Sequence, residues 1–170
     1  MCIGESVGGI SRPAASSTLM DASHVIASYG GDLLRFATAL VGPSEAPDLV
    51  ADCVVRLLRS DRLASAQDVR SYLYRTLLNQ ARSNHRAAYR RGLRERASAE
   101  LAVGWWDEVG PRVELLDAVS RLSPRRRGVL FAVYWLDLDT EGAASLLGIS
   151  TRTLERELRA SKALLKEVLS

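Results

Sequence analysis

Six polar residues recur at helical spacing near the end of the chain, opposite an apolar stripe. They are Thr151, Arg152, Glu155, Arg156, Arg159 and Lys162. Arginine and lysine can donate hydrogen bonds to phosphates and to guanine, and glutamate can accept one from the amino group of cytosine. A helix with such a face can therefore read base edges in the major groove of DNA. The alternative is an ordinary helical hairpin with a solvated charged face.

The residues around this face predict a helix-turn-helix. Asp139 or Thr140 can cap a short first helix, and Gly148 supplies the left-handed residue that ends it. Ser150 is a suitable N-cap for the second helix. The buried stripe of that second helix follows a spacing of three or four and consists of Leu154, Leu158, Ser161, Leu165 and Val168.

A second candidate binding element is a basic stripe between Arg70 and Arg96, where eight arginines face one acid, Glu95. A capping pair at Ser65 and Asp68 opens a long predicted helix that stops at Gly92. Its first half carries apolar residues at core spacing and its second half is mostly arginine and polar residues. We interpret the second half as a ligand-facing arm.

Three consecutive arginines, Arg125, Arg126 and Arg127, follow the cap-and-proline pair Ser123-Pro124 at the start of another predicted helix. The helix dipole disfavours cations in a first turn, and a phosphate partner would offset that repulsion. Three solvated arginines are the alternative interpretation, and the sequence does not decide between the two.

Composition excludes several classes of function. The chain has 170 residues, a formal net charge of +3, two cysteines and two histidines. Cys2, Cys53, His24 and His85 lack the spacing of a disulfide framework, a metal site or a nucleophile-base pair, so we expect no cofactor, no metal and no enzyme activity. With no membrane-spanning run and no signal peptide, the expected location is cytoplasmic.

Helical periodicity recurs along the chain without strand-like alternation, so the predicted class is all-α, with two small helical domains. The expected boundaries are a flexible lead at 1–21, a first domain at 22–96, a linker at 97–112 and a helix-turn-helix domain at 113–170. Gly104 and Gly110-Pro111 favour the linker, and we expect Trp105 and Trp106 within it to pack against one of the domains.

The order of these features resembles the small, two-domain sigma factors of bacterial RNA polymerase, of the extracytoplasmic-function type, over roughly residues 22–169. Residues 47–58 resemble the helix that docks on the clamp of the large polymerase subunit. Residues 72–74, with Asn79 and Arg86, resemble the helix that captures the melted minus-ten element.

The second block of the resemblance lies in the last third of the chain. Leu122-Ser123-Pro124 with Arg127, followed by residues 147–150 and 153–154, resembles the domain that reads the minus-thirty-five element. The resemblance implies a transcription initiation factor that binds the polymerase core, directs it to promoters and promotes strand opening. It also implies an anti-sigma factor as a further partner.

Carried onto this sequence, the resemblance implies three sets of site residues. The polymerase-binding set is Asp48, Leu49, Asp52 and Arg56. The minus-ten set, whose arginines would neutralise phosphates and whose tyrosines would stack on unpaired bases, is Tyr72, Tyr74, Arg75, Asn79, Arg82, Arg86, Tyr89, Arg90 and Arg91. The minus-thirty-five set is Arg125, Arg126, Arg127, Ser150, Thr151, Arg152, Thr153, Glu155, Arg156, Arg159 and Lys162.

Two other classes of protein remain open from the sequence. An autonomous helix-turn-helix regulator would bind duplex DNA without polymerase. A sigma-like interaction protein that has lost promoter recognition would bind the polymerase core and fail to direct initiation.

Overall fold

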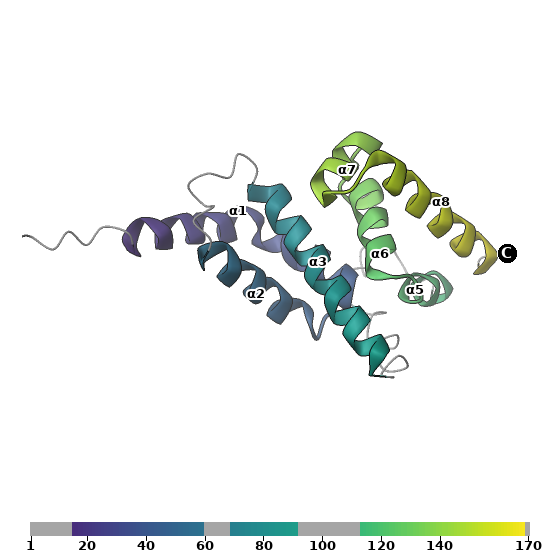
Figure 1. The fold of residues 1–170 in the computed structure, drawn as a ribbon, viewed down its shortest axis with the longest axis horizontal. Helices are drawn as coiled ribbons and strands as arrows, with labels where there is room; N and C mark the ends of the chain where they lie inside the picture. Colours follow the sequence, from purple (N-terminus) through teal and green to yellow (C-terminus); the bar gives the residue numbers. More distant parts are fainter. Residues whose placement is uncertain (1–14, 60–68, 92–112, 169–170) are drawn as a thin grey trace, which may run out of the picture.

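The computed structural model describes residues 15–59, 69–91 and 113–168, and the regular elements in these ranges are all helical (Figure 1). The all-α prediction is confirmed. The first half of the chain contains α1 (Ala15–Val41), α2 (Ala46–Arg59) and α3 (Val69–Arg90). The second half contains α5 (Val113–Ser120), α6 (Pro124–Leu130), the π-helix η2 (Phe131–Trp135), α7 (Thr140–Leu147) and α8 (Thr151–Val168).

Helix α1 begins at Ala15, which lies inside the segment predicted to be a flexible lead. Residues 15–21 of the predicted lead are therefore helical, and the N-terminal end of α1 projects beyond the rest of the molecule (Figure 1). Helix α1 ends at Val41, and Gly42 directly after it has a positive φ of 94°. The predicted linker, with Trp105 and Trp106, lies outside the described residues.

Helix α6 continues directly into η2, and the transition changes which side chains are buried. Leu136 N donates to Phe131 O at 3.1 Å, a π-type bond that widens the turn by one residue. As a result Phe131 and Ala132 are fully buried, whereas Val133 and Leu136, which an α-helical spacing places in the core, are only half-buried. Asp137 then turns the chain with a φ of 50°.

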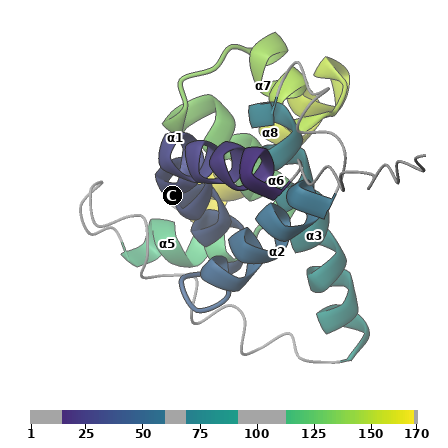
Figure 2. The same ribbon diagram turned by 90° about the vertical axis from the view of Figure 1, so that its left-hand side faces the viewer.

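The two helical halves pack against each other through one continuous core. The Phe36 ring of α1 lies 4.8 Å from the Tyr74 ring of α3 and 5.2 Å from the Phe131 ring of η2, measured between centroids. Gly128 allows the close approach of α6, because a Cβ there would lie 3.2 Å from Leu78 Cδ1. Viewed along α1, α6 lies directly beside it and α7 sits above the start of α3 (Figure 2).

Because the core is shared, removing the Phe131 ring should destabilise both halves together. We expect Phe131→Ala to lower the free energy of unfolding by about 3–5 kcal/mol, since it deletes a fully buried ring. Urea denaturation followed by circular dichroism measures the change. Tyr134→Ala, on the same element but 61% exposed, is the control and should cost far less. Two separate transitions, only one of them moved by Phe131→Ala, would contradict a shared core.

Candidate nucleic-acid interface

The helix-turn-helix forms with the caps that the sequence predicts. Asp139 Oδ1 accepts from Gly142 N at 2.7 Å at the start of α7, and Gly148 ends that helix with a φ of 65°. Ser150 Oγ accepts from Thr153 N at 3.2 Å and donates to Thr153 Oγ1 at 2.9 Å, which caps α8. These local hydrogen bonds fix the angle at which α8 leaves the turn.

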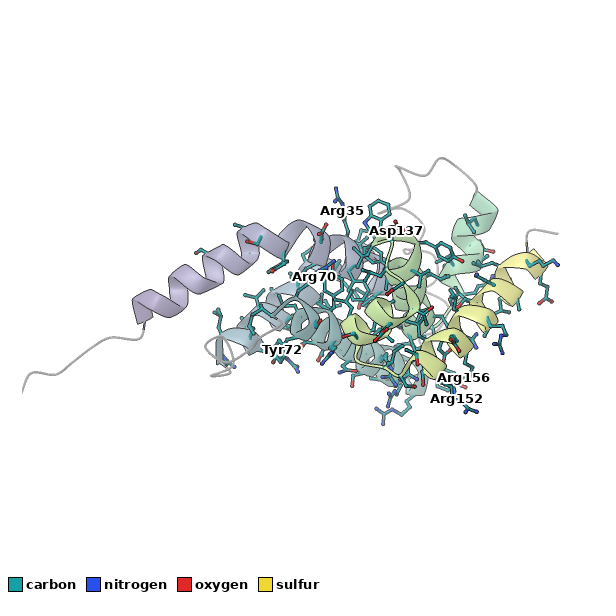
Figure 3. All side chains as sticks on the ribbon, turned by 90° about the horizontal axis from the view of Figure 1, so that it is seen from above. Arg35, Arg70, Tyr72, Asp137, Arg152 and Arg156 are labelled. Atoms are coloured by element: carbon teal, nitrogen blue, oxygen red, sulfur yellow. The ribbon has the colours of Figure 1, made fainter. Side chains whose placement is uncertain are left out.

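Helix α8 presents the predicted polar face to solvent. The exposed residues are Thr151, Arg152, Glu155, Arg156, Arg159 and Lys162. Leu154 and Ser161 are fully buried on the opposite side, and Ser161 Oγ donates to Glu157 O at 2.7 Å. Figure 3 places Arg152 and Arg156 on the same side of the molecule as Tyr72 of α3, away from Arg35. The structure therefore leaves this face of α8 open to a partner.

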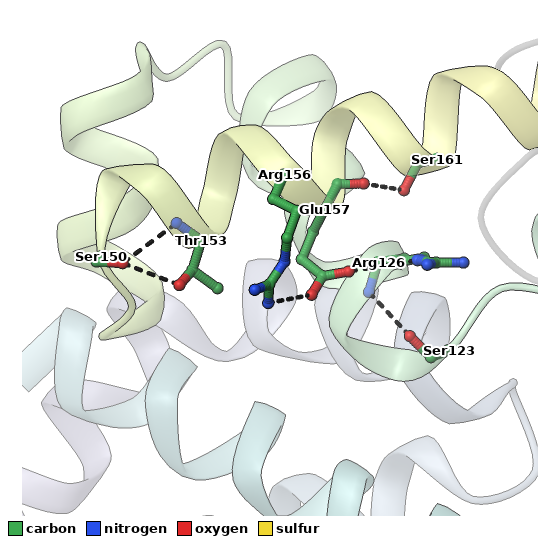
Figure 4. Close-up of polar contacts among 7 residues, drawn as sticks. All are labelled: Ser123, Arg126, Ser150, Thr153, Arg156, Glu157 and Ser161. Atoms are coloured by element: carbon green, nitrogen blue, oxygen red, sulfur yellow. Dashed lines mark hydrogen bonds and ion pairs between the residues drawn. The ribbon is translucent and has the colours of Figure 1, made fainter.

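Glu157 joins α8 to α6 through an ion-pair clamp (Figure 4). Its carboxylate accepts from Arg126 Nε at 3.3 Å and from Arg156 Nη2 at 3.1 Å, and its side chain is only 13% exposed. Burial alone would raise the pKa of Glu157, but the hydrogen bonds and charges of Arg156 and Arg126 outweigh burial and hold that pKa below its usual value. The sequence could have indicated this role, because Glu157 shares one face of α8 with the predicted buried residues Leu154, Leu158 and Ser161.

The three consecutive arginines have three different environments. Arg125 and Arg126 are half-buried, and Arg126 belongs to the clamp. Arg127 is 4% exposed and lies among the core residues of α6. Its inclusion among residues that contact upstream DNA is therefore corrected, because its guanidinium is not on the surface. Neither interpretation of the sequence, three phosphate ligands or three solvated arginines, fits Arg127.

Helix α3 collects the other predicted residues on one face and on its free end. Tyr72, Arg75, Asn79, Arg82 and Arg86 follow a spacing of three or four, so they share a face. Tyr89, Arg90 and Arg91 are exposed at the C-terminal end of the helix. This arrangement supports the predicted basic arm.

Tyr74 is the exception among these residues. It is fully buried between Phe36 and the rest of the core, and burial raises the pKa of its hydroxyl. Its prediction as a base-stacking residue is corrected for this arrangement, because no part of its ring is available to a partner. Tyr72 is half-buried and Tyr89 is 54% exposed, so both rings have surface on which an unpaired base can stack.

The helix-turn-helix lies against the same face of α3 (Figure 1). Arg75 Nη2 donates to Ser145 O of α7 at 2.6 Å. Gly148 packs so closely on Arg75 that a Cβ at this position would lie 2.7 Å from Arg75 Cδ. Part of the predicted minus-ten face is thus covered by the element predicted to read the upstream DNA.

Arginines of both halves meet beside this contact. A groove of about 410 Å³ between α3, α6 and α8 is lined by Arg82, Arg86, Arg125 and Arg126, with Glu157 among its lining residues. Burial, and then the charges of Arg125 and Arg86, lower the pKa of Arg82. The two predicted DNA-binding sets therefore converge on one cationic surface.

Helix α2 carries the predicted polymerase-binding residues at its solvent face. Asp48, Asp52 and Arg56 are exposed and lie four residues apart, so they form one stripe. Leu49 is 4% exposed and packs in the core, so its assignment to the docking set is corrected. Val55, 44% exposed within the same stripe, was not among the predicted residues. The sequence could have identified Val55, because it is an apolar residue that does not follow the spacing of the buried residues of α2.

The described residues contain neither a helix long and apolar enough to cross a membrane nor a group of metal-binding side chains. Cys53 is buried and donates to Leu73 O at 3.7 Å, and burial raises the pKa of its thiol to about 11, so it is protonated at neutral pH.

Comparison with known proteins decides the family. Residues 25–91 match Sigma-70 region 2, and residues 112–165 match Sigma-70, region 4. An RNA polymerase sigma-E factor of Streptomyces avermitilis is 32% identical over 143 residues, which cover 81% of this chain and 78% of the relative. The chain belongs to the sigma-70 family of RNA polymerase sigma factors.

Other relatives agree with this assignment. The sigma-E factor of Streptomyces coelicolor is 31% identical over 148 residues, covering 81% of this chain and 79% of the relative. The fold is similar to that of the sigma factor RpoE from Bartonella quintana, solved with the anti-sigma factor NepR, with a TM-score of 0.66 and 20% identity over 88% of this chain and 96% of that one. It is also similar to CnrH, solved with the cytosolic domain of CnrY, with a TM-score of 0.59 and 23% identity over 89% of this chain and 94% of that one.

This sigma factor is a transcription initiation factor that directs RNA polymerase to promoter DNA, and the family is not enzymatic. The predicted resemblance to the extracytoplasmic-function type is confirmed. The region 2 match contains α2, α3 and most of α1, and the region 4 match contains α6, α7 and nearly all of α8. The faces described above are therefore distributed between the two matched regions of the family.

The Glu157 clamp should make stability depend on acid pH. Because the pKa of Glu157 is lowered by folding, its stabilisation is complete above the ordinary value of 4.5 and is lost as the pH falls through the folded-state pKa. We expect Glu157→Gln to be less stable than wild type at neutral pH and the difference to shrink as the pH falls below 4.5. Urea unfolding at each pH measures it, with exposed Glu167→Gln as the control. A difference that stays constant with pH would show that the carboxylate charge is not involved.

Proposed function

We propose that the exposed faces of α2, α3 and α8 have separate roles in promoter recognition. The α2 stripe of Asp48, Asp52 and Arg56 binds the polymerase core. The exposed residues of α3 hold the opened minus-ten strand, and α8 reads the minus-thirty-five element in the major groove. The observation that carries the proposal is the capped helix-turn-helix, because it leaves the polar face of α8 exposed while its apolar face is in the core.

Strand opening needs no covalent chemistry from this protein. Capture of unpaired bases and phosphates by α3 shifts the melting equilibrium, because the protein binds the opened strand better than the duplex. Arg86, Arg90 and Arg91 supply exposed cations for the phosphates, and Tyr89 supplies an exposed ring for stacking. Two weak sites on one chain gain from effective concentration, which favours a bipartite promoter.

We further infer that the closed arrangement opens before both elements are read. Arg75 donates to Ser145 of α7 and packs against Gly148, and Tyr74 is buried in the core beside Phe36. A strand lying along the whole face of α3 would displace α7. An anti-sigma factor that favours the closed form would act against this opening, and RpoE from Bartonella quintana, which has a similar fold, was crystallised with the anti-sigma factor NepR.

The upstream role of α8 is tested by Arg156→Ala. Loss of one exposed arginine of the reading face should weaken use of the minus-thirty-five element by about 1–3 kcal/mol and leave binding to the polymerase core unchanged. Run-off transcription with the reconstituted holoenzyme, on templates with intact or scrambled upstream elements, measures the effect. Arg121→Ala, an exposed arginine outside this face, is the control. Equal transcription by the wild-type protein from both templates would remove the proposed role.

The polymerase-binding role of α2 is tested by Asp52→Arg. Charge reversal at the centre of the exposed stripe should weaken association with the core about tenfold or more, equivalent to about 1.4 kcal/mol. Fluorescence anisotropy of the labelled sigma factor titrated with core enzyme measures it. Glu167→Arg, an exposed charge reversal at the end of α8, should retain normal affinity. Full affinity in Asp52→Arg would place the docking surface elsewhere.

A further inference from the structure

Arg127 is a buried cation, and two of its three guanidinium nitrogens have no hydrogen-bond acceptor among the described residues. The residue is 4% exposed, and the two nitrogens are Nε and Nη1. Burial lowers the pKa of Arg127 to about 10, so the guanidinium is still charged at neutral pH. A buried charge that lacks a counterion is costly, and an anion placed beside it would stabilise the fold.

Arg127 also lines a cavity, which has a volume of about 390 Å³. Leu40 and Val41 at the end of α1 and Ala81 of α3 give it an apolar side, while Asn84 and Arg91 of α3 add polar groups. A concave, partly apolar cavity with a few convergent polar groups is the usual form of a small-molecule site.

We propose that this cavity binds a small organic monocarboxylate, whose carboxylate pairs with Arg127 and whose apolar body packs against Leu40, Val41 and Ala81. No cofactor or substrate role is involved, and the site is separate from the exposed face of α8.

The charge of the lining selects this class of ligand. Arg127 and Arg91 favour an anion, but Glu45 also lines the cavity and is exposed to solvent. The negative charge of Glu45 disfavours ligands with several charges, such as nucleoside polyphosphates. The apolar side of the cavity disfavours small hydrated ions, which have no hydrocarbon to bury there. A single carboxylate on a hydrocarbon body satisfies both parts of the lining.

The location of the cavity gives the ligand a regulatory effect. Its lining comes from α1 and α3 in the first half of the chain and from Pro124 and Arg127 in the second half. The site is therefore complete only while the two halves are packed together. A ligand that binds only the closed form must shift the population towards that form. This regulatory step rests on the proposed opening during promoter recognition, whereas the binding itself does not.

Binding is tested on the free full-length protein with hexanoate as the probe and hexanamide as its neutral counterpart. Isotope-edited NMR of the arginine Nε–H resonances follows the titration. We expect saturable shifts of the Arg127 resonance and binding of hexanamide about tenfold weaker, because the amide lacks the charge. Arg127→Gln should lose the preference for the acid over the amide, and exposed Arg121→Gln should keep it. Equal binding of acid and amide, or no saturable shift in the wild-type protein, would overturn the proposal.

Two further variants keep the test decisive if Arg127→Gln folds poorly. Ala88→Met places a larger side chain in the cavity and should abolish hexanoate binding. Glu45→Gln removes a repulsive charge and should tighten it. If hexanoate binds only in Glu45→Gln, then Glu45 is the natural counterion of Arg127 and the proposal is wrong.

Run-off transcription with and without hexanoate separates this inference from the proposed function. The inference predicts that saturating hexanoate lowers transcription by the wild-type holoenzyme and leaves Arg127→Gln unaffected. Saturable binding without any effect on transcription would overturn the regulatory step alone. Absence of promoter-specific transcription without hexanoate would instead count against the proposed function.

Discussion

The contact of three rings, Phe36 of α1, Tyr74 of α3 and Phe131 of η2, is the constraint on which the arrangement of this sigma factor depends. All three rings are fully buried, and they come from both family regions. Burial of large aromatic side chains is among the strongest contributions to protein stability. The ring contact thereby keeps α6 and α7 against α3, and every accessible surface of the chain follows from that packing.

The same packing explains why the two DNA-binding surfaces are unequal in the closed form. The reading face of α8 points to solvent, because its apolar side is held in the core by Leu154 and by the clamp at Glu157. The face of α3 is partly covered by α7, and Arg75 is engaged by a backbone carbonyl. A protein in this state can present its upstream reader before its strand-capturing face. Separation of the halves would release Arg75 from Ser145 at the cost of the contact between the Phe36 and Phe131 rings.

The local elements could be predicted from the sequence, because their signals are local. Asp139, Gly148 and Ser150 cap or end helices through bonds to residues three or four positions away, and these caps are present. The partner of each helix could not be predicted, since periodicity identifies a buried face without saying what covers it. Leu49 is an example: it was predicted to bind the polymerase because it belongs to the docking motif, but its side chain packs in the core.

The π-turn at Phe131 shows a second limit, because one widened turn moves the buried face by one residue and no local residue signals it. Arg127 shows a third. A run of three arginines indicates a cationic surface, and only the packing of α6 against α3 buries the last of them. These features follow from tertiary contacts between segments far apart in the sequence, as does the cationic groove that joins the two halves.

The distance between the two halves during initiation tests the central claim most directly. Fluorescent labels at Ser28 of α1 and Lys166 of α8, both exposed, would report it by energy transfer in a Cys2→Ser background, where the remaining Cys53 is buried. The account predicts a single distance for the free protein and a longer one in the complex with polymerase core and promoter DNA. An unchanged distance in an initiation complex that is active in transcription would show that the closed packing is the working form.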